Sequence, residues 1–426
     1  MAKEIKHIND TVSDLPEGFK MTELGPLPEE WEVVRLGDIF EIQQGKALSP
    51  KHRMGKSPFP FLRTANILWG QIDLSVVDEM DFTNEEVQRF KLLPGDLLVC
   101  EGGDIGRTAI WRGELPVCCY QNHIHRLRSK NQEIEPEFYM YWIQTAILLF
   151  GLYLGQENKT TIPNLSKSRL ATFAVPLPPL SKQKAIAYVL QTVQRAKEAT
   201  EKVIQATQEL KKSLMRHLFT YGPVPIDEVD KVQLKETEIG LVPEHWEVVR
   251  LGELANIRYG KAKPKTSGSI PVIGSGGIYA WTDQALVDFP TLIIGRKGTA
   301  GQVWLVRGSC WPSDTTFYLE WHIPDCRAIA DFLYCVFLLN PLSGEHAKTT
   351  LPSLQRHDLE NYLIPLPPIH EQQEIAHILQ AVDQKIEAEK AKKQALETLF
   401  QSLLHNLMTG KLCVKDIILP KTKEMI

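Results

Sequence analysis

The chain has 426 residues, of which 43% are hydrophobic and 23% are charged. This composition is typical of a globular protein and excludes a disordered or collagen-like chain, and the length predicts two or three folded units. Forty-eight Lys and Arg residues against 52 Asp and Glu residues give a formal net charge of −4, so a nucleic-acid partner could be bound only through local basic patches.

The N-terminal residues 1–20 carry charges throughout and lack the apolar core of a secretory signal, which favours a cytoplasmic location. The seven cysteines include no C-x-x-C pair, so we expect reduced, mostly structural thiols and neither a disulfide framework nor a metal site. An uncharged stretch at 138–156 is nearly long enough to cross a bilayer. Gln, Thr and Gly residues interrupt it, and we therefore expect a buried core helix and no membrane partner.

The sequence contains an internal repeat, which is the strongest guide to its architecture. Three landmarks occur twice in the same order, while the residues between them diverge. The paired segments are LGPLPEEWEVVRLGD (24–38) and IGLVPEHWEVVRLGE (239–253), KTTIPNL (159–165) and KTTLPSL (348–354), and VPLPPL (175–180) and IPLPPI (364–369). The pattern predicts two related globular modules that share a frame and differ in their binding residues.

The first module carries a segment without acidic residues at 42–72. Its positive charges suit contacts with DNA phosphates, and neighbouring amides suit the reading of base edges. The candidate DNA-binding residues here are Lys46, Lys51, Arg53, Lys56, Arg63, Asn66, Gln121 and Asn122. The alternative is a solvated basic loop whose polar residues cap strands and turns.

A long helix is predicted after each PLPP hinge, because proline fixes an extended entry and apolar residues then recur at steps of three and four. Ser181 is the expected N-cap of the first helix. At ~1.5 Å per residue, residues 181–219 would extend about 58 Å, so the helix needs a partner along its length. We expect the two helices to pair antiparallel as an intramolecular coiled coil. The predicted interface consists of Ile186, Val189, Val193, Val203, Leu210, Leu214, Ile375, Ile378, Val382, Leu396, Leu399 and Leu403. The alternative is two helices that each pack on their own module.

The second module repeats the acid-free segment at 254–282. Recurrence at a matching position favours DNA phosphate binding over a solvated loop. Its candidate DNA-binding residues are Arg258, Lys261, Lys263, Lys265, Ser275, Arg296, Lys297 and Thr315. The glycine-rich pieces at 101–107, 274–277 and 295–301 fit neither the phosphate-binding loop nor the dinucleotide fingerprint, so they predict tight turns.

These features together predict an α+β chain with two α/β modules, two long antiparallel helices and an approximate internal two-fold axis. The predicted boundaries are an N-terminal tail (1–20), a first module (21–175), a hinge with the central helix (176–222), a linker with the second module (223–364), a hinge with the distal helix (365–410) and a C-terminal tail (411–426). The chain lacks H-E-x-x-H, G-x-S-x-G, deaminase and amino-methyltransferase motifs, so we expect no catalytic residues. The alternatives to a noncatalytic DNA-binding protein are a coiled-coil scaffold without DNA binding and a methyltransferase with an unrecognised cofactor site.

The doubled WEVVRLG and PLPP segments, with PFLRTANILWGQID, LLPGDLLVCEGGDIGRTAI, LIIGRKGTAGQVW and SDTTFYL, resemble the specificity subunits of type I restriction-modification systems over about residues 20–410. The resemblance implies two target recognition domains separated by two antiparallel helices. It also implies a noncatalytic subunit that reads an asymmetric bipartite site in double-stranded DNA, with a spacer set by the helices.

The resemblance further implies the partners. Two modification subunits would supply S-adenosylmethionine and the adenine-methylating site, and restriction subunits would supply the motor and nuclease with ATP and magnesium. No cofactor is expected on this chain.

Overall fold

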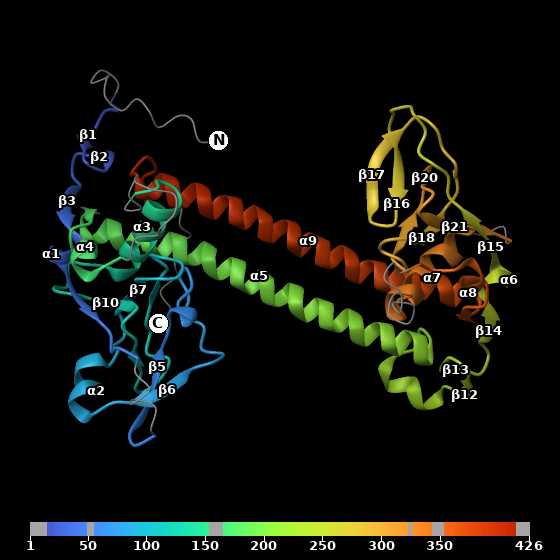
Figure 1. The fold of residues 1–426 in the computed structure, drawn as a ribbon, viewed down its shortest axis with the longest axis horizontal. Helices are drawn as coiled ribbons and strands as arrows, with labels where there is room; N and C mark the ends of the chain where they lie inside the picture. The colour runs from blue at the N-terminus through green and yellow to red at the C-terminus, as the bar shows by residue number, and fades with distance from the viewer. Residues whose placement is uncertain (1–14, 49–54, 153–164, 323–325, 343–352, 415–426) are drawn as a thin grey trace, which may run out of the picture. The chain divides into compact units, whose positions relative to one another are not determined.

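A computed structural model describes residues 15–48, 55–152, 165–322, 326–342 and 353–414 (Figure 1). The chain divides into two compact units. Unit 1 comprises Met1–Ala199 with Lys393–Ile426, and unit 2 comprises Thr200–Lys392. Each unit therefore contains one globular module together with part of each of two long helices. Within the described ranges, no helix has both the length and the apolar character needed to cross a membrane.

Unit 1 contains a four-stranded sheet in the order β4-β10-β7-β8 and a three-stranded sheet in the order β6-β5-β9. Two short pairs, β1-β2 and β11-β3, complete its strands. The strands are β1 (Phe19–Thr22), β2 (Gly25–Pro28), β3 (Glu32–Arg35), β4 (Phe40–Gln44), β5 (Pro58–Leu62), β6 (Asp78–Asp81), β7 (Leu97–Cys100), β8 (Thr108–Ile110), β9 (Cys119–Tyr120), β10 (Ile124–Ser129) and β11 (Ala174–Leu177). The helices are α1 (Leu36–Ile39), η2 (Thr64–Asn66), α2 (Asn84–Phe90), α3 (Pro136–Leu148), α4 (Lys167–Ala171) and the start of α5 (Leu180–Tyr221).

Unit 2 repeats this arrangement strand for strand. Its four-stranded sheet has the order β15-β21-β18-β19, its three-stranded sheet has the order β17-β16-β20, and its two pairs are β12-β13 and β14-β22. The strands are β12 (Leu234–Thr237), β13 (Gly240–Pro243), β14 (Glu247–Arg250), β15 (Ala255–Tyr259), β16 (Ile270–Gly274), β17 (Gly277–Thr282), β18 (Thr291–Gly295), β19 (Val303–Val306), β20 (Trp311–Pro312), β21 (Thr316–Trp321) and β22 (Leu363–Leu366). The helices are η3 (Ile226–Lys231), α6 (Leu251–Leu254), α7 (Cys326–Leu339), α8 (Arg356–Glu360) and α9 (Ile369–Met408).

The predicted duplication is thus confirmed at the level of strand register. Gln44 pairs with His125 in unit 1, and Tyr259 pairs with Phe317 at the same point of unit 2. Each three-stranded sheet contains one parallel pairing, β5 with β9 and β16 with β20. Helix α2 is an addition of unit 1 and accounts for part of its greater length. Its N-terminus is a capping box, in which the Thr83 hydroxyl accepts from Glu86 N and the Glu86 carboxylate accepts from Thr83 N.

Each four-stranded sheet packs its buried face against a helix rich in apolar residues. In unit 1 this helix is α3, and Phe138 and Trp142 pack with Trp31 in the core. This confirms the expectation of a buried helix for residues 138–148 of the uncharged stretch, whereas residues 153–156 lie outside the described ranges. In unit 2 the corresponding helix is α7, whose Phe332 packs against Phe219 at 5.5 Å between ring centroids.

The two long helices begin where the hinges predict. Helix α5 begins at Leu180 and α9 at Ile369, directly after their proline pairs. Ser181 therefore lies in the first turn and is not the N-cap. A buried glutamine closes each hinge: the Gln183 side chain donates to Pro178 O and the Gln372 side chain donates to Pro367 O, both at 2.8 Å.

Within each unit, the portions of α5 and α9 lie side by side and run antiparallel (Figure 1), as predicted, but part of the predicted interface is wrong. Val203, Leu210 and Leu399 are exposed. The buried positions are one residue away, at Ile204, or on the opposite helix, at Ile386. The physical reason is that polar side chains share the contact face, so apolar spacing alone places the face incorrectly. Of the other predicted residues, Ile186, Val189 and Ile375 are buried, and Val193, Leu214, Ile378, Val382, Leu396 and Leu403 are partly buried.

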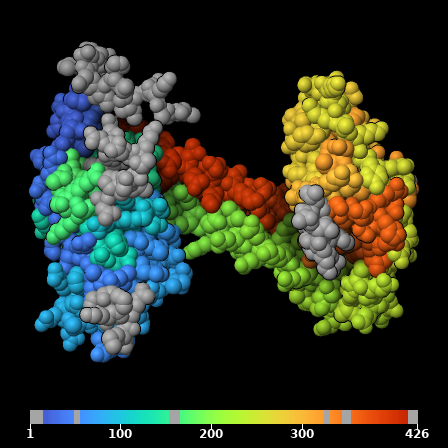
Figure 2. All heavy atoms as spheres, viewed as in Figure 1, coloured from blue at the N-terminus to red at the C-terminus, as the bar shows by residue number. Residues whose placement is uncertain are grey.

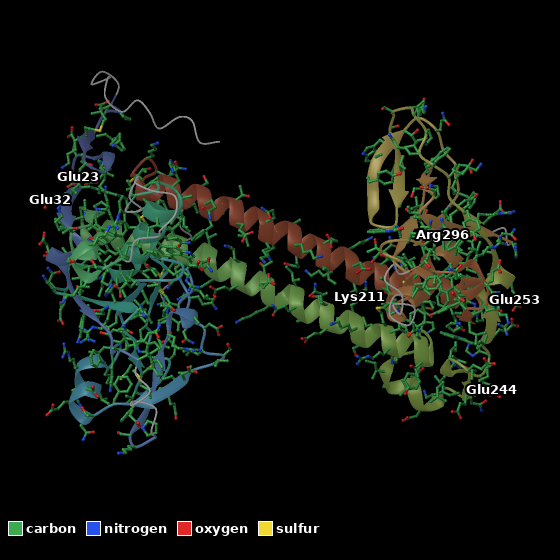
Figure 3. All side chains as sticks on the ribbon, viewed as in Figure 1. Glu23, Glu32, Lys211, Glu244, Glu253 and Arg296 are labelled. Atoms are coloured by element: carbon green, nitrogen blue, oxygen red, sulfur yellow. The ribbon has the colours of Figure 1, made fainter. Side chains whose placement is uncertain are left out.

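Polar contacts join the helices within each unit. In unit 1, Lys197 Nζ lies 3.6 Å from Glu397 Oε1 and 5.1 Å from the centre of the Phe400 ring. In unit 2, Lys211 Nζ donates to both carboxylate oxygens of Asp383, at 2.6 and 2.8 Å. Figure 3 shows Lys211 on α5. Ion pairs between two helices help to fix their axial register.

Candidate nucleic-acid interface

Each acid-free segment has a glycine at the end of its first strand, Gly45 in one and Gly260 in the other. No other residue could replace either glycine without a shift of the neighbouring backbone. A Cβ atom on Gly45 would lie 2.3 Å from Gln121 O, and one on Gly260 would lie 2.1 Å from Ser313 O. The next residues, Lys46 and Lys261, form isolated β-bridges with Gln121 and Ser313. The two segments therefore occupy equivalent places, as their spacing from the repeated WEVVRLG element indicates.

Lys46 has a structural position and not the exposed one that was predicted. Its side chain is buried, and its ammonium donates to Glu86 Oε2 and to Asp81 O, both at 2.7 Å. The same ammonium lies 4.7 Å from the centre of the Phe82 ring. Helix α2 supplies Glu86, so the extra helix of unit 1 neutralises this cation. Lys56 is exposed, whereas Lys51 and Arg53 lie outside the described residues.

Arg63 and Asn66 hold the turn that follows β5. The Asn66 amide is buried, donates to Asp73 O and Val76 O at 2.8 Å each, and accepts from Arg63 N at 2.9 Å. Arg63 Nη1 lies 3.2 Å from Asp78 Oδ2. These bonds turn the Asn66 amide into the protein. The prediction that Asn66 contacts DNA is therefore wrong, because its side chain is used to shape the loop.

Gln121 and Asn122 lie in the turn between β9 and β10. Gln121 is buried and Asn122 is half-buried. The backbone of Asn122 donates to Lys46 O at 2.8 Å and accepts from the Gln44 side chain at 2.9 Å. Gln121 is therefore placed inside the frame, while Asn122 keeps a partly accessible side chain.

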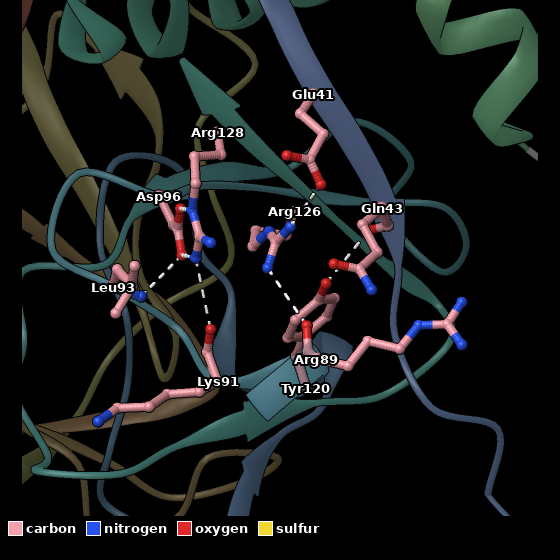
Figure 4. A network of polar contacts seen from close by, with 9 residues as sticks. All are labelled: Glu41, Gln43, Arg89, Lys91, Leu93, Asp96, Tyr120, Arg126 and Arg128. Atoms are coloured by element: carbon pink, nitrogen blue, oxygen red, sulfur yellow. Dashed lines mark hydrogen bonds and ion pairs between the residues drawn. The ribbon is translucent and has the colours of Figure 1, made fainter. Parts of the chain in front are cut away.

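Two arginines on β10 belong to a polar network inside unit 1 (Figure 4). Arg128 donates from Nε and Nη2 to the two oxygens of Asp96, at 2.7 Å each. This bidentate bond is the main reason that the pKa of Arg128 is raised. Arg126 Nη2 donates to Glu41 at 3.1 Å. Positive charge near the candidate readers of unit 1 is thus largely paired within the protein.

The basic segment of unit 2 is different, because its lysines face outward. Lys261, Lys263 and Lys265 are exposed, and none of them forms an ion pair with a described residue. Arg258 is also exposed, but its guanidinium lies 2.8 Å from Glu320 Oε2. Three unpaired ammonium groups within five residues are a surface suited to phosphates.

The glycine-rich turns of unit 2 meet at one backbone carbonyl. Thr315 O accepts from the Ser275 hydroxyl at 2.7 Å, from Arg296 N at 2.8 Å and from Lys297 N at 3.3 Å. Three turns far apart in the sequence are therefore held together, and four of the predicted site residues lie in one cluster. Ser275 is buried by this role, whereas Lys297 is exposed.

Arg296 shows how the shared frame presents different chemistry in the two units. Its guanidinium carbon lies 5.2 Å from the centre of the Tyr259 ring and 5.9 Å from that of Phe317, and Nη2 donates to Asp314 O at 2.8 Å. Its Nε is buried and has no hydrogen-bond partner within the described part of the chain. Stacking on aromatic rings holds an arginine side chain in place.

In unit 1 the corresponding three positions carry Gln44, Glu101 and His125, as the strand pairing establishes. The Glu101 carboxylate accepts from Gln44 Nε2 at 2.8 Å and lies 4.0 Å from His125 Nε2. A hydrogen-bonded carboxylate thus replaces a stacked guanidinium. The same frame carries opposite charges at one position.

The sequence prediction missed a group of exposed apolar side chains in unit 2. Ile278, Tyr279 and Trp281 on β17 are 57%, 58% and 51% exposed, and Tyr259 on β15 is half-exposed. The available signal was the presence of aromatic residues inside the acid-free segment 254–282. For metals, the described residues contain no group of three or more His, Cys, Asp or Glu that could hold an ion.

The cysteines follow the sequence prediction where the structure describes them. Cys100, Cys118, Cys119, Cys310 and Cys335 are free and buried. Burial raises the pKa of each of these thiols to about 12, so they remain protonated and unreactive.

Comparisons with known proteins agree with this duplicated architecture. The family described as type I restriction modification DNA specificity domain matches residues 28–212 and again 243–398. The chain is 27% identical to the putative type I restriction enzyme MjaX specificity subunit of Methanocaldococcus jannaschii, covering 94% of this chain and 97% of the relative. It is 21% identical to the type I restriction enzyme EcoDI specificity subunit of Escherichia coli, covering 91% and 90%.

Two solved structures share the fold. A crystal structure of the type I restriction-modification system S subunit from M. genitalium aligns with a TM-score of 0.61 at 17% identity, covering 88% of this chain and 96% of that one. A chain from a study of complex assembly and conformational transition of the type I R-M system aligns with a TM-score of 0.53 at 18% identity, covering 91% and 99%.

Proposed function

We propose, from the fact that this chain belongs to the type I restriction-modification DNA specificity family, that each of its two modules reads one half of a bipartite site in double-stranded DNA. The chain is a specificity subunit, and its relatives bear that name. Its role is to bind DNA and to bring other subunits to it, without carrying out the chemistry itself.

The observation that carries this proposal is the frame that the two units share. Glu101 and Arg296 occupy one position of that frame, and Lys46 and Lys261 occupy another. Glu101 is buried and accepts from Gln44, and Lys46 is buried beside Glu86, whereas Arg296 is partly exposed and Lys261 is exposed. Equivalent positions of the two units therefore present different chemistry to a base edge or a phosphate. Two equal frames with unequal residues favour two unlike half-sites, and hence an asymmetric sequence.

The two long helices would set the spacer between the half-sites. They are continuous through the residues that join the units, Leu180–Tyr221 and Ile369–Met408. A helix has a fixed rise of about 1.5 Å per residue, which makes its length a defined distance. Half-site spacing follows protein geometry in other DNA-binding proteins.

The partners would be two modification subunits and, in the full enzyme, restriction subunits. We expect S-adenosylmethionine on the former and ATP and magnesium on the latter, with no cofactor on this chain, and we expect the complex to act in the cytoplasm. Exposed apolar side chains on the long helices, including Tyr188, Leu210 and Leu399, offer docking points for such subunits.

The alternatives have less support. A scaffold without DNA binding leaves the exposed, unpaired lysines at 261, 263 and 265 without a role. A methyltransferase would need a cofactor-binding motif, and the sequence contains none that we recognise. Incubation of the purified chain with labelled S-adenosylmethionine and DNA should give no incorporation until modification subunits are added.

The test of the spacer uses paired insertions. Seven residues added to α5 after Ala199 and seven added to α9 after Lys392 preserve a heptad and lengthen the helix pair by about 10 Å, which is about three base pairs. Mapping of methylated adenines in a host that expresses the assembled complex should show the same half-sites with a longer spacer.

The control is a seven-residue insertion between Pro223 and Pro225, outside the helices, which should leave the spacer unchanged. A paired-helix insertion that keeps full methylation at the original spacing would overturn the role of the helices. Loss of methylated sites in a host lacking this chain is the accompanying check on the DNA-specificity role.

A further inference from the structure

The β16–β17 hairpin of unit 2 presents apolar side chains to solvent where a polar surface would be expected. Figure 1 shows the hairpin projecting from the four-stranded sheet, and Figure 2 shows its residues, in yellow, on the surface of the unit. Ile278, Tyr279 and Trp281 are each more than half exposed. We refer to these three side chains as the aromatic hairpin surface. Single exposed apolar residues are normal on a protein surface, whereas neighbouring ones that form a patch indicate an interaction site.

The backbone of the hairpin is shaped to display these residues. The register shifts between Val272 and Ile273, so Val272 pairs with Ala280 while Ile273 pairs with Ile278. Tyr279 is the extra residue of this bulge. A bulge interrupts the alternation of a strand and redirects a side chain, which lets the neighbours Ile278 and Tyr279 both point outward.

Glycine makes room for the tyrosine. A Cβ atom on Gly274 would lie 3.2 Å from two carbons of the Tyr279 ring, and 3.6 Å from Ser313 Oγ. The ring is therefore placed beside the cluster in which Ser275, Thr315 and Arg296 meet. The aromatic hairpin surface is continuous with the predicted DNA-binding residues of this unit.

The unpaired lysines run along the same three-stranded sheet. The segment that carries them begins at β20, where Trp311 Nε1 donates to Lys261 O at 3.0 Å. It ends against β17, where the hydroxyls of Thr266 and Thr282 lie 2.9 Å apart. Gly268 approaches the Thr282 carbonyl so closely that a Cβ atom would lie 2.5 Å from it. Lys261, Lys263 and Lys265 are thus held beside the aromatic hairpin surface.

The combination of charge and ring selects the occupant. Three ammonium groups that have no acidic partner among the described residues attract phosphates, and no acidic residue occurs between 254 and 282. The edges of the bases lie in the groove between the two phosphate backbones of a duplex. An apolar surface beside phosphate-binding lysines would therefore contact these base edges. In the major groove the apolar feature of a base edge is the C5-methyl group of thymine.

We propose that the aromatic hairpin surface is the sequence-reading element of the second module, and that Tyr279 and Trp281 contact thymine methyl groups in its half-site. This inference rests on the proposed DNA-specificity function and names residues for it. The flanking lysines supply phosphate contacts that carry no sequence information.

The described residues of unit 1 do not repeat this aromatic surface at the matching place. The parallel pairings show that β5 corresponds to β16. Asp78 of unit 1 is therefore equivalent to Ala280 of unit 2, and Glu79 is equivalent to Trp281. Glu79 is exposed. A carboxylate at this position cannot make the same apolar contact and would repel a phosphate. The thymine contact is therefore a property of the second half-site only.

The experiment measures binding of the assembled complex with modification subunits to its methylated target sequence, once that target has been mapped. Duplexes with deoxyuridine in place of single thymines remove one methyl group at a time. At one or more thymines of one half-site, the wild type should lose affinity several-fold, up to about 10-fold. Tyr279→Ala or Trp281→Ala should lower affinity for the unmodified duplex by a similar factor and abolish the effect of deoxyuridine at that thymine.

The controls separate this inference from the function on which it rests. Lys263→Ala with Lys265→Ala should weaken target and non-target DNA alike and reduce the salt dependence by about two ions. Glu79→Ala should not change any deoxyuridine effect. Both hairpin residues are exposed, so thermal melts should match the wild type, and Trp281→Gln provides a second variant if the alanine is poorly folded.

Each outcome decides one point. Hairpin variants that bind the target normally, or that keep the full deoxyuridine effect, overturn the inference while the lysine variants still report on DNA binding. Loss of the modification subunits on size-exclusion chromatography would identify the surface as a protein-docking site and also overturn it. Unchanged DNA binding in the lysine and hairpin variants together would instead contradict the DNA-specificity function.

Discussion

Trp246 donates its indole N–H to Glu371 Oε2 at 2.9 Å, whereas the equivalent indole of Trp31 is buried without an acceptor among the residues that the structure describes. Both tryptophans belong to the repeated WEVVRLG element and are almost wholly buried. The matching helix residue in unit 1 is Lys182, which pairs with Glu30 and cannot accept a hydrogen bond. The duplicated frame thus keeps the ring and changes its polar partner.

This difference predicts unequal effects of two alanine substitutions. Glu371→Ala leaves the Trp246 N–H buried and unsatisfied, and it also removes the 2.6 Å contact with His245, so we expect unit 2 to lose about 1–3 kcal/mol. Lys182→Ala removes a partly exposed ion pair and should cost less than about 1 kcal/mol. Urea unfolding followed by circular dichroism measures both. Equal losses would mean that the indole bond contributes little.

His125 predicts a dependence of stability on pH. Burial lowers the pKa of His125 below its ordinary value of 6.5, and its Nε2 lies 2.8 Å from Leu165 O. The unfolded chain therefore binds a proton at His125 more readily than the folded chain. The free energy of unfolding falls as the pH drops below about 6.5, and this destabilisation is absent well above that pH. His125→Phe, which copies Phe317 of unit 2, should remove this component.

The measurement is the difference in unfolding free energy between wild type and His125→Phe as a function of pH. Other histidines titrate in both proteins, so only the difference is informative. Loss of the bond to Leu165 adds a constant offset. A difference that stays constant between pH 8 and pH 5 would show that His125 titrates normally in the folded protein.

Asp96 anchors the network of Figure 4 and predicts a large loss of stability. It is buried, accepts both bonds from Arg128 and a third from Leu93 N at 2.7 Å. Asp96→Ala should cost about 3–5 kcal/mol, because it leaves a partly buried guanidinium without its counter-charge. Asp78→Ala, which breaks the more exposed pair with Arg63, is the control and should cost much less. Similar melting temperatures for the two variants would count against the network.

The sequence was sufficient for the frame but not for the orientation of side chains. Repeated segments, hinges and long helices were predicted correctly, since α5 and α9 end within a few residues of their expected limits. Lys46 was predicted as a DNA contact because Glu86, its partner, lies 40 residues away in a helix that has no counterpart among the described residues of unit 2. The aromatic hairpin surface was missed because exposure of an apolar strand depends on what the fold leaves uncovered.

The seam between the long helices gives a prediction that corrects the sequence-based one. Ile204 is buried and its neighbour Val203 is exposed. Ile204→Asp should destabilise the protein by several kcal/mol, because a charge would be buried without a partner. Val203→Asp and Leu210→Asp should change stability by less than about 1 kcal/mol. Thermal melts of the three variants decide the point, and a strong loss with Leu210→Asp would restore the original assignment.

Charge reversal at Lys46 and Lys261 tests the most direct consequence of the repeat, because the two residues occupy the same position of two frames. Lys46→Glu places a carboxylate beside Glu86 and Asp81 O, so it should destabilise unit 1 by about 3–5 kcal/mol. Lys261→Glu alters an exposed side chain without an ionic partner among the described residues. Its melting temperature should therefore be that of the wild type, while DNA binding by the assembled complex weakens and its salt dependence falls. Thermal melts and binding titrations at two salt concentrations separate the effects. A variant at Lys46 that melts normally but binds DNA poorly would return that lysine to the DNA-binding surface.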